Sequence, residues 1–177
     1  EFLLLVLDVC TGGEQPASHY QPDKLIEKFD ALKTYFTAGE FYEKMLYYRL
    51  LLDYYTIRRD IKDGQGNYSL ILKGPKDDSD KLKQYQSMLY VSTEAFYNWL
   101  KPYLRKLEQD ELHSCAEMLA FLKKEDNERH GVLPARKDLS YKASGNIRYW
   151  FWRLDYYLWE QRSTFFNEEE QKISFVY

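Results

Sequence analysis

Apolar residues recur every three to four positions along most of this chain, which is the spacing of one buried face of an α-helix. A typical stretch has Leu25, Phe29, Leu32 and Phe36 in register, preceded by Pro22, which suits a first helical turn. The same spacing predicts helices that begin near residues 2, 22, 40, 81, 93, 110 and 144. The pattern therefore indicates an all-α fold, a bundle of about six or seven helices.

The longest apolar stretch, about residues 40–60, is expected to lie at the centre of the core. Tyr42, Leu46, Arg49 and Asp53 share one face of this predicted helix, and Arg49 can pair with Asp53 four residues on. The remaining faces are almost entirely apolar, which is typical of a helix surrounded by others.

Other helix boundaries follow from capping residues and breakers. Ser92 or Thr93 is expected to cap the helix that follows residue 91, and Pro102 is expected to kink or divide that helix. Asp110 is expected to cap the next one, whose apolar face carries Leu112, Cys115, Leu119 and Leu122. The stretch 127–141 has no helical period and is predicted to be a long loop.

Turn residues interrupt the helices near residue 65. The run 63–67 combines Asp, Asn and two glycines, and the segment 68–72 can form a short strand. The fold prediction accordingly allows one short strand or hairpin near 67–73. No internal repeat or linker divides the chain, so residues 1–177 are expected to form a single helical domain.

Composition adds an unusual number of aromatic rings to this picture. The 177 residues include 17 Tyr, 10 Phe and 4 Trp, while a formal net charge of −3 excludes a histone-like basic protein and an acidic disordered tail. Most rings are predicted to face the core, at positions such as Phe29, Phe36, Phe96 and Phe151. The aromatic excess is therefore interpreted mainly as packing.

The ends and the cysteines bear on where the protein acts. Cys10 and Cys115 are expected to be reduced thiols of a cytoplasmic protein, and the apolar run 3–7 is too short to span a membrane. The chain begins and ends inside apolar segments. We therefore expect it to be a fragment of a longer polypeptide.

Catalytic motifs are missing from the sequence. There is no phosphate-binding glycine loop, no dinucleotide fingerprint and no HExxH, and the three histidines, His19, His113 and His130, are scattered. We expect no catalytic residue, no cofactor and no metal site in this chain.

The predicted helix 144–162 carries two distinct stripes. Its apolar stripe consists of Ile147, Phe151, Leu154 and Leu158. Its second stripe is polar and aromatic and consists of Arg148, Trp152, Asp155, Trp159 and Arg162. This second stripe has two interpretations. Arg148 and Asp155 could anchor the core through an ionic network, or the stripe could stack on bases or on a partner.

Positive charge gathers just before and within this helix. Residues 129–153 hold six basic residues and one acid, a net +5 in a chain of net −3. A basic segment that leads into an aromatic helix is typical of a phosphate-contacting surface. The candidate nucleic-acid contacts are Arg136, Lys137, Lys142 and Arg148, and the alternative is ordinary solvation or pairing within the chain.

Five segments together resemble a known family. The helical middle region of GmrSD-type proteins, which are bacterial modification-dependent restriction and phage-defence proteins, is similar to residues 2–7 (FLLLVL), 48–60 (YRLLLDYYTIRRD), 85–92 (YQSMLYVS), 97–100 (YNWL) and 147–154 (IRYWFWRL). The resemblance implies a ParB-like nucleotide-hydrolysing domain before this region and a His-Asn-His nuclease domain after it. The parent would be a nucleotide-dependent DNA endonuclease, and this chain would carry neither catalytic site.

The expected function is therefore a non-catalytic scaffold that connects those two domains and engages DNA. Its expected partners are the flanking domains and double-stranded DNA, with no membrane. The alternative is a purely structural or protein-interaction module without nucleic-acid contact. The oligomeric state and the type of nucleic acid stay open at this point.

Overall fold

The computed structural model describes residues 1–61, 68–77, 79–92, 95–135, 139 and 146–172. Within these residues the chain forms eight α-helices, seven of them with at least seven residues, and one antiparallel hairpin. The helices are α1 (Phe2–Cys10), α2 (Leu25–Leu32), α3 (Ala38–Tyr55), α4 (Ser79–Val91), α5 (Phe96–Glu108), α6 (Cys115–His130), α7 (Asn146–Glu160) and α8 (Arg162–Phe165). The mostly helical fold predicted from the sequence is confirmed.

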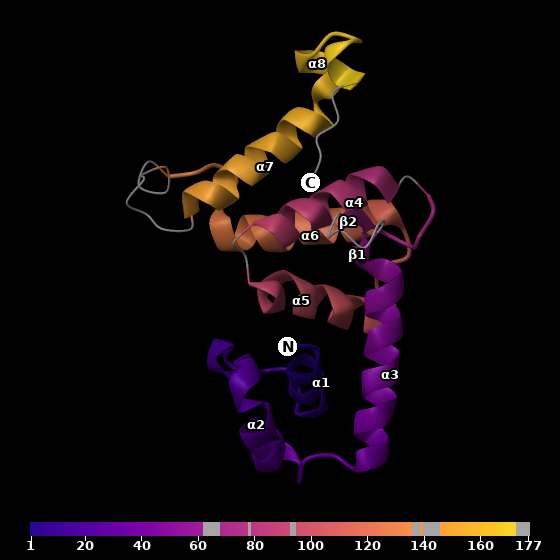
Figure 1. Ribbon diagram of the computed structural model, residues 1–177, viewed down its shortest axis with the longest axis vertical. Coiled ribbons are helices and arrows are strands. Elements are labelled where there is room, and N and C mark those ends of the chain that lie inside the picture. The colour runs from indigo at the N-terminus through magenta and orange to yellow at the C-terminus, as the bar shows by residue number, and fades with distance from the viewer. Residues whose placement is uncertain (62–67, 78, 93–94, 136–138, 140–145, 173–177) are drawn as a thin grey trace.

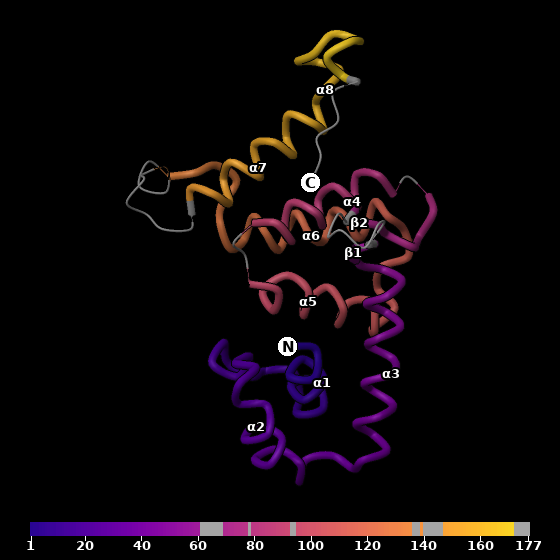
Figure 2. The backbone as a smooth tube through the Cα atoms, in the orientation of Figure 1, coloured from indigo at the N-terminus to yellow at the C-terminus, as the bar shows by residue number. Residues whose placement is uncertain are grey.

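The helices form a stepped stack whose order in space differs from the order in the chain, because α5 lies between α1 and the layer of α6 and α4 (Figure 1). Helix α1 contacts α2 and α3, α3 contacts α5, α5 contacts α6, and α4 contacts both α6 and α7. Figure 2 shows α3 running along one side of the lower part, whereas α1 lies between α2 and α3. Helix α7 lies across the far end of the stack and leads to α8.

Helix α1 is the most deeply buried element. Leu4, Leu5, Val6 and Leu7 have no exposed surface, so most of this short helix, which is apolar apart from Asp8, is enclosed by others. Its predicted boundaries, about residues 2–9, agree with the structure. The core continues through large side chains of the other helices, including Tyr48, Leu82, Met88, Tyr103, Leu104, Met118 and Leu122.

Helix α3 departs from its prediction in both length and place. It ends at Tyr55, and residues 58–61 form strand β1 instead of further helix. Its buried side chains are Tyr48 and Leu51, while much of its apolar surface faces outward, so the expectation that it is central to the core is wrong. The central place is taken by α1. The predicted Arg49–Asp53 pair is present at 2.9 Å.

The predicted strand near 67–73 is confirmed as half of a hairpin. Strand β1 (Arg58–Ile61) pairs antiparallel with β2 (Tyr68–Ile71), with Arg58 opposite Ile71. The turn predicted at 63–67 lies outside the described residues. Gln86 of α4 fastens the start of the hairpin, because its Oε1 accepts from the Ile57 amide at 2.9 Å and its Nε2 donates to the Tyr55 carbonyl at 3.0 Å.

Helices α5 and α6 begin at other residues than predicted, so two predicted capping residues are wrong. Helix α5 begins after Ala95, so the predicted cap at Ser92 or Thr93 is not used, and Pro102 lies inside one continuous helix. Helix α6 begins after Ser114, whose hydroxyl accepts from the Glu117 amide while Glu117 bonds back to the Ser114 amide. Asp110 instead lies in the turn after α5.

The predicted loop 127–141 begins later than expected. Helix α6 continues to His130, and Gly131, with a φ of 81°, ends it. Residues 136–138 and 140–141 of this stretch are outside the described part of the chain.

Candidate functional site

The structure describes one of the four predicted phosphate contacts. Arg148 lies exposed on the first turn of α7, and Arg136, Lys137 and Lys142 lie outside the described residues. Two further basic residues of the same segment bond to the chain itself. Arg129 donates through Nη1 to the Asn98 carbonyl at 2.5 Å, and Arg153 bonds inward, as described below. The positive charge offered to a partner is therefore smaller than the sequence count.

Helix α7 faces the core with the side opposite to the one predicted. Tyr149, Trp150 and Tyr156 are buried, whereas Phe151 and Leu154 of the predicted apolar stripe are 57% and 48% exposed. Both sides of the helix are apolar enough to be buried, so hydrophobicity alone does not choose between them. The choice follows from hydrogen bonds to a buried carboxylate on α6.

The polar and aromatic stripe of α7 is also placed differently. Trp152 and Trp159 pack against the core, and the Arg162 guanidinium lies 4.7 Å from the centre of the Trp159 ring. Asp155 is partly buried, and desolvation raises its pKa. These contacts favour packing over a base-stacking surface, although the ionic network is not built from Arg148 and Asp155.

That network is centred on Asp126, which has no exposed surface. The hydroxyls of Tyr85 on α4 and Tyr149 on α7 each donate to its Oδ2 at 2.7 Å. Arg153 Nη1 lies 3.8 Å from the same oxygen and donates to the Tyr149 hydroxyl at 2.9 Å and to the Gly131 carbonyl at 2.8 Å. One carboxylate thus joins α4, α6 and α7.

The surroundings of Asp126 keep its donors protonated. Burial first, and the Asp126 charge and hydrogen bond next, raise the pKa values of Tyr85 and Tyr149 far above their usual range. One turn away, Lys123 Nζ binds both carboxylate oxygens of Glu160, at 2.7 and 2.9 Å. Helix α7 is therefore attached to α6 by two separate ionic contacts.

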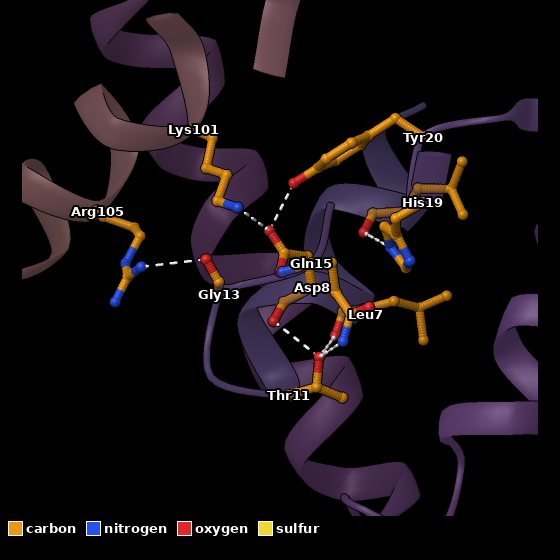
Figure 3. Close-up of polar contacts among 10 residues, drawn as sticks. Leu7, Asp8, Thr11, Gly13, Gln15, His19, Tyr20, Lys101 and Arg105 are labelled. Carbon is orange, nitrogen blue, oxygen red and sulfur yellow. Dashed lines mark hydrogen bonds and ion pairs between the residues drawn. The ribbon is translucent and has the colours of Figure 1, made fainter. Parts of the chain in front are cut away.

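A second buried carboxylate, Asp8, joins α1 to α5 (Figure 3). Asp8 is fully buried and accepts from the Tyr20 hydroxyl at 2.5 Å and from the Gln15 amide at 2.7 Å. Lys101 Nζ of α5 lies 2.7 Å from Asp8 Oδ2. The Tyr20 ring stacks on Tyr97, with 4.7 Å between centroids. Both oxygens of this carboxylate are satisfied.

The loop after α1 also contacts α5, through Gly13. Arg105 donates to the Gly13 carbonyl at 3.3 Å, and a Cβ on Gly13 would lie 2.7 Å from the Arg105 Nη1. Gly13 has a φ of 77°, so glycine suits both its backbone and this close approach. His19 completes the region by hydrogen bonding through Nε2 to the Leu4 carbonyl at 2.8 Å.

The sequence contained a signal for one of these carboxylates. Asp8 interrupts an otherwise apolar helix, and a charge in such a place is buried only with partners. Asp126 lies among the charged residues 123–128, a stretch typical of a solvated face. Its burial could not be predicted from that pattern.

Both clusters join helices through a buried carboxylate. In the part of the chain that is described, no group of three or more His, Cys, Asp or Glu side chains could hold a metal ion. None of the described helices has both the length and the apolar character to cross a membrane. The arrangement holds helices together.

The surface features that distinguish this molecule are exposed apolar side chains on two helical faces. One face, on α7 and α8, consists of Phe151, Leu154, Tyr157 and Phe165, each 48–57% exposed. The other, on α3, consists of Tyr42, Leu46, Tyr47, Leu50 and Tyr54, each 41–64% exposed. Large apolar groups gathered on one face are typical of protein contacts.

Comparison of this chain with protein-family models, with curated proteins and with solved structures finds no match in any of the three.

Proposed function

We propose that this chain is a non-catalytic helical scaffold that connects the nucleotide-hydrolysing and nuclease domains of a GmrSD-like restriction protein. The observation that carries the proposal is the exposed apolar face on α7 and α8. This face lies on a helix whose opposite side is held by Asp126 and Lys123 of α6, so it is presented in a fixed orientation. A rigid apolar face is suited to pack against a neighbouring domain of the same polypeptide.

Hydroxyl-radical footprinting tests this docking role. Phe151, Leu154 and Tyr157 are labelled in the 177-residue chain and in the polypeptide encoded by the uninterrupted reading frame around it. We expect labelling to fall at least about fivefold in the longer polypeptide, because a docked domain excludes water from the face. Tyr35, which is 71% exposed outside either apolar face, is the reference.

Equal labelling in both polypeptides would contradict the docking role. A reading frame without a His-Asn-His motif downstream would contradict the GmrSD-like assignment, whatever the labelling.

DNA contact is a second candidate function, supported by the exposed position of Arg148 at the start of α7. Arg136, Lys137 and Lys142 would complete the contact. A filter-binding titration with a short duplex at low and moderate salt measures it. Four phosphate contacts predict a slope of log K against log salt of about −3.6.

Replacing these four residues by Ala should abolish most of that slope. The matched control replaces four exposed lysines elsewhere, Lys24, Lys33, Lys76 and Lys81, and removes the same charge. Absent binding at low salt, or equal losses in the two quadruple variants, would overturn the DNA role and leave the protein-interaction module.

A further inference from the structure

The exposed face of α3 has an internal symmetry that the proposed connecting role does not require. Tyr42, Leu46, Leu50 and Tyr54 follow one another at intervals of four residues, so they form a continuous stripe along the helix. The order Tyr-Leu-Leu-Tyr reads the same in both directions, with its centre at residue 48. All four side chains are at least 46% exposed.

A palindromic stripe is complementary to a second copy of itself. When two identical helices pack antiparallel about a two-fold axis, residue i of one faces residue j of the other, and j faces i. With the axis at residue 48, Tyr42 faces Tyr54 of the second copy and Leu46 faces Leu50. We propose that this face of α3 joins two copies of the chain as an antiparallel, two-fold symmetric dimer.

Two basic side chains beside the stripe are paired within their own chain, and the two-fold register sets the exposed Glu43 level with Asp53 of the second copy. Arg49 is already paired with Asp53 at 2.9 Å, and Lys44 is bound to Glu108 on α5, so these charges are compensated within one chain. Glu43 is exposed beside Tyr42. The same two-fold axis brings the Tyr54 hydroxyl of the second copy, a donor, toward this acceptor.

The exposed area of the α3 face determines how tightly the dimer is expected to associate. With about 200 Å² for a fully exposed side chain of this size, the exposed fractions of Tyr42, Leu46, Tyr47, Leu50 and Tyr54 correspond to about 500 Å² on each chain. Two such faces bury about 1,000 Å², which is the lower end for a specific interface. We therefore expect a dimer that dissociates in the micromolar range.

Sedimentation equilibrium of the chain between about 1 and 200 µM measures this association. The wild type should shift from monomer to dimer over that range. A variant with Leu46→Glu and Leu50→Glu should stay monomeric, with dimerisation weakened more than about tenfold, because like charges then face each other across the axis. Both positions are about 60% exposed, so the fold should be retained, as circular dichroism will verify.

Charge exchange separates a direct contact from an indirect effect. A second variant with Leu46→Lys and Leu50→Lys should also be monomeric alone, whereas an equimolar mixture with the glutamate variant should dimerise again. Tyr35→Glu, at a position that is 71% exposed outside either apolar face, is the matched control and should leave the wild-type association unchanged.

Cysteine cross-linking tests the antiparallel arrangement. A mixture of Tyr42→Cys and Tyr54→Cys chains should form a disulfide across the interface. Tyr42→Cys alone should not exceed the wild-type background from Cys10 and Cys115, because its two copies would lie about 18 Å apart along the axis. A wild type that stays monomeric at 200 µM, or that dimerises equally well with glutamates at 46 and 50, overturns the proposal.

Discussion

Asp8 lies in the last turn of an otherwise apolar helix and is fully buried, yet it has a complete set of partners. The Lys101 ammonium supplies the opposite charge at 2.7 Å, and the Tyr20 hydroxyl and the Gln15 amide supply hydrogen bonds. A buried pair of this kind adds little net stability compared with apolar packing, but breaking it is costly because one charge remains in the interior. Asp8 therefore fixes how α1 meets α5.

Removing that carboxylate should destabilise the protein strongly. We expect Asp8→Ala to lower the free energy of unfolding by about 3 kcal/mol, since the Lys101 side chain is only 16% exposed and would lose its counter-charge. Urea denaturation followed by circular dichroism measures the loss. The control is Asp30→Ala in the exposed pair with Lys33, which should change the stability by less than about 0.5 kcal/mol.

An Asp8→Ala loss no larger than that of Asp30→Ala would show that the buried pair is not an anchor.

Glu108 is expected to make the free energy of unfolding depend on pH in the acid range. Burial alone would raise its pKa, but hydrogen bonds from Lys44 and Tyr48, together with the charges of Lys44 and Arg105, lower it below the usual value. A carboxylate with a depressed folded-state pKa stabilises the fold fully above its unfolded-state pKa of about 4.3. That contribution is lost as the pH falls from there through the folded-state pKa.

The acid dependence should therefore be weaker in Glu108→Gln than in the wild type. The difference in the free energy of unfolding between the two proteins should be largest near pH 7 and should shrink below about pH 4. Urea titrations at a series of pH values measure it. Glu128→Gln, in a pair with Lys124 at 3.7 Å, serves as the comparison, and a pH-independent difference for Glu108→Gln would contradict the assignment.

At the scale of elements, α7 shows how a polar contact selects a helix face. Its two sides differ little in apolar character, and the side that carries Tyr149 and Arg153 is buried because Asp126 needs donors. The side that carries Phe151 and Leu154 is left exposed as a result. The orientation of the candidate docking face thus depends on one carboxylate of another helix.

Weakening the Asp126 contacts should loosen α7 before the rest of the fold. We expect Tyr85→Phe combined with Tyr149→Phe to speed amide hydrogen exchange across residues 146–160 at least about tenfold, because the buried carboxylate loses both hydroxyl donors. Exchange in α1 should change less. Tyr157→Phe, an exposed position on the same helix, is the control, and uniform exchange rates in all three proteins would refute the idea.

At the scale of the whole molecule, one set of buried side chains runs from α1 through α3, α4, α5 and α6 to α7. Its members contact one another across elements that are far apart in the sequence. A continuous core of this kind is expected to unfold as one unit.

Urea unfolding should therefore show a single transition. Tryptophan fluorescence reports mainly on Trp99 in α5 and on the three tryptophans of α7, whereas far-UV circular dichroism reports on all helices. The two midpoints should coincide, and they should still coincide in Trp99→Phe, in which only α7 contributes fluorescence. Separate midpoints would mean that α7 and α8 unfold independently of the remaining helices.

The helical fold, a first helix that begins near residue 2 and the strand near residue 70 could be predicted from the sequence. The reason is physical: helical hydrogen bonds join residues four apart, so the spacing of apolar positions records them locally. Arg148 lies exposed on α7 and its candidate role stays a prediction, whereas the three other candidate contacts lie outside the described residues.

The faces of the helices were decided by tertiary structure. Helix α3 has enough apolar surface for a central position, but α1 takes that position and leaves the palindromic stripe outside. Asp126 is buried because Tyr85, 41 residues before it, and Tyr149, 23 residues after it, come together there. Burial of a charge depends on partners brought from distant parts of the chain, and no local pattern of apolar and polar positions records them.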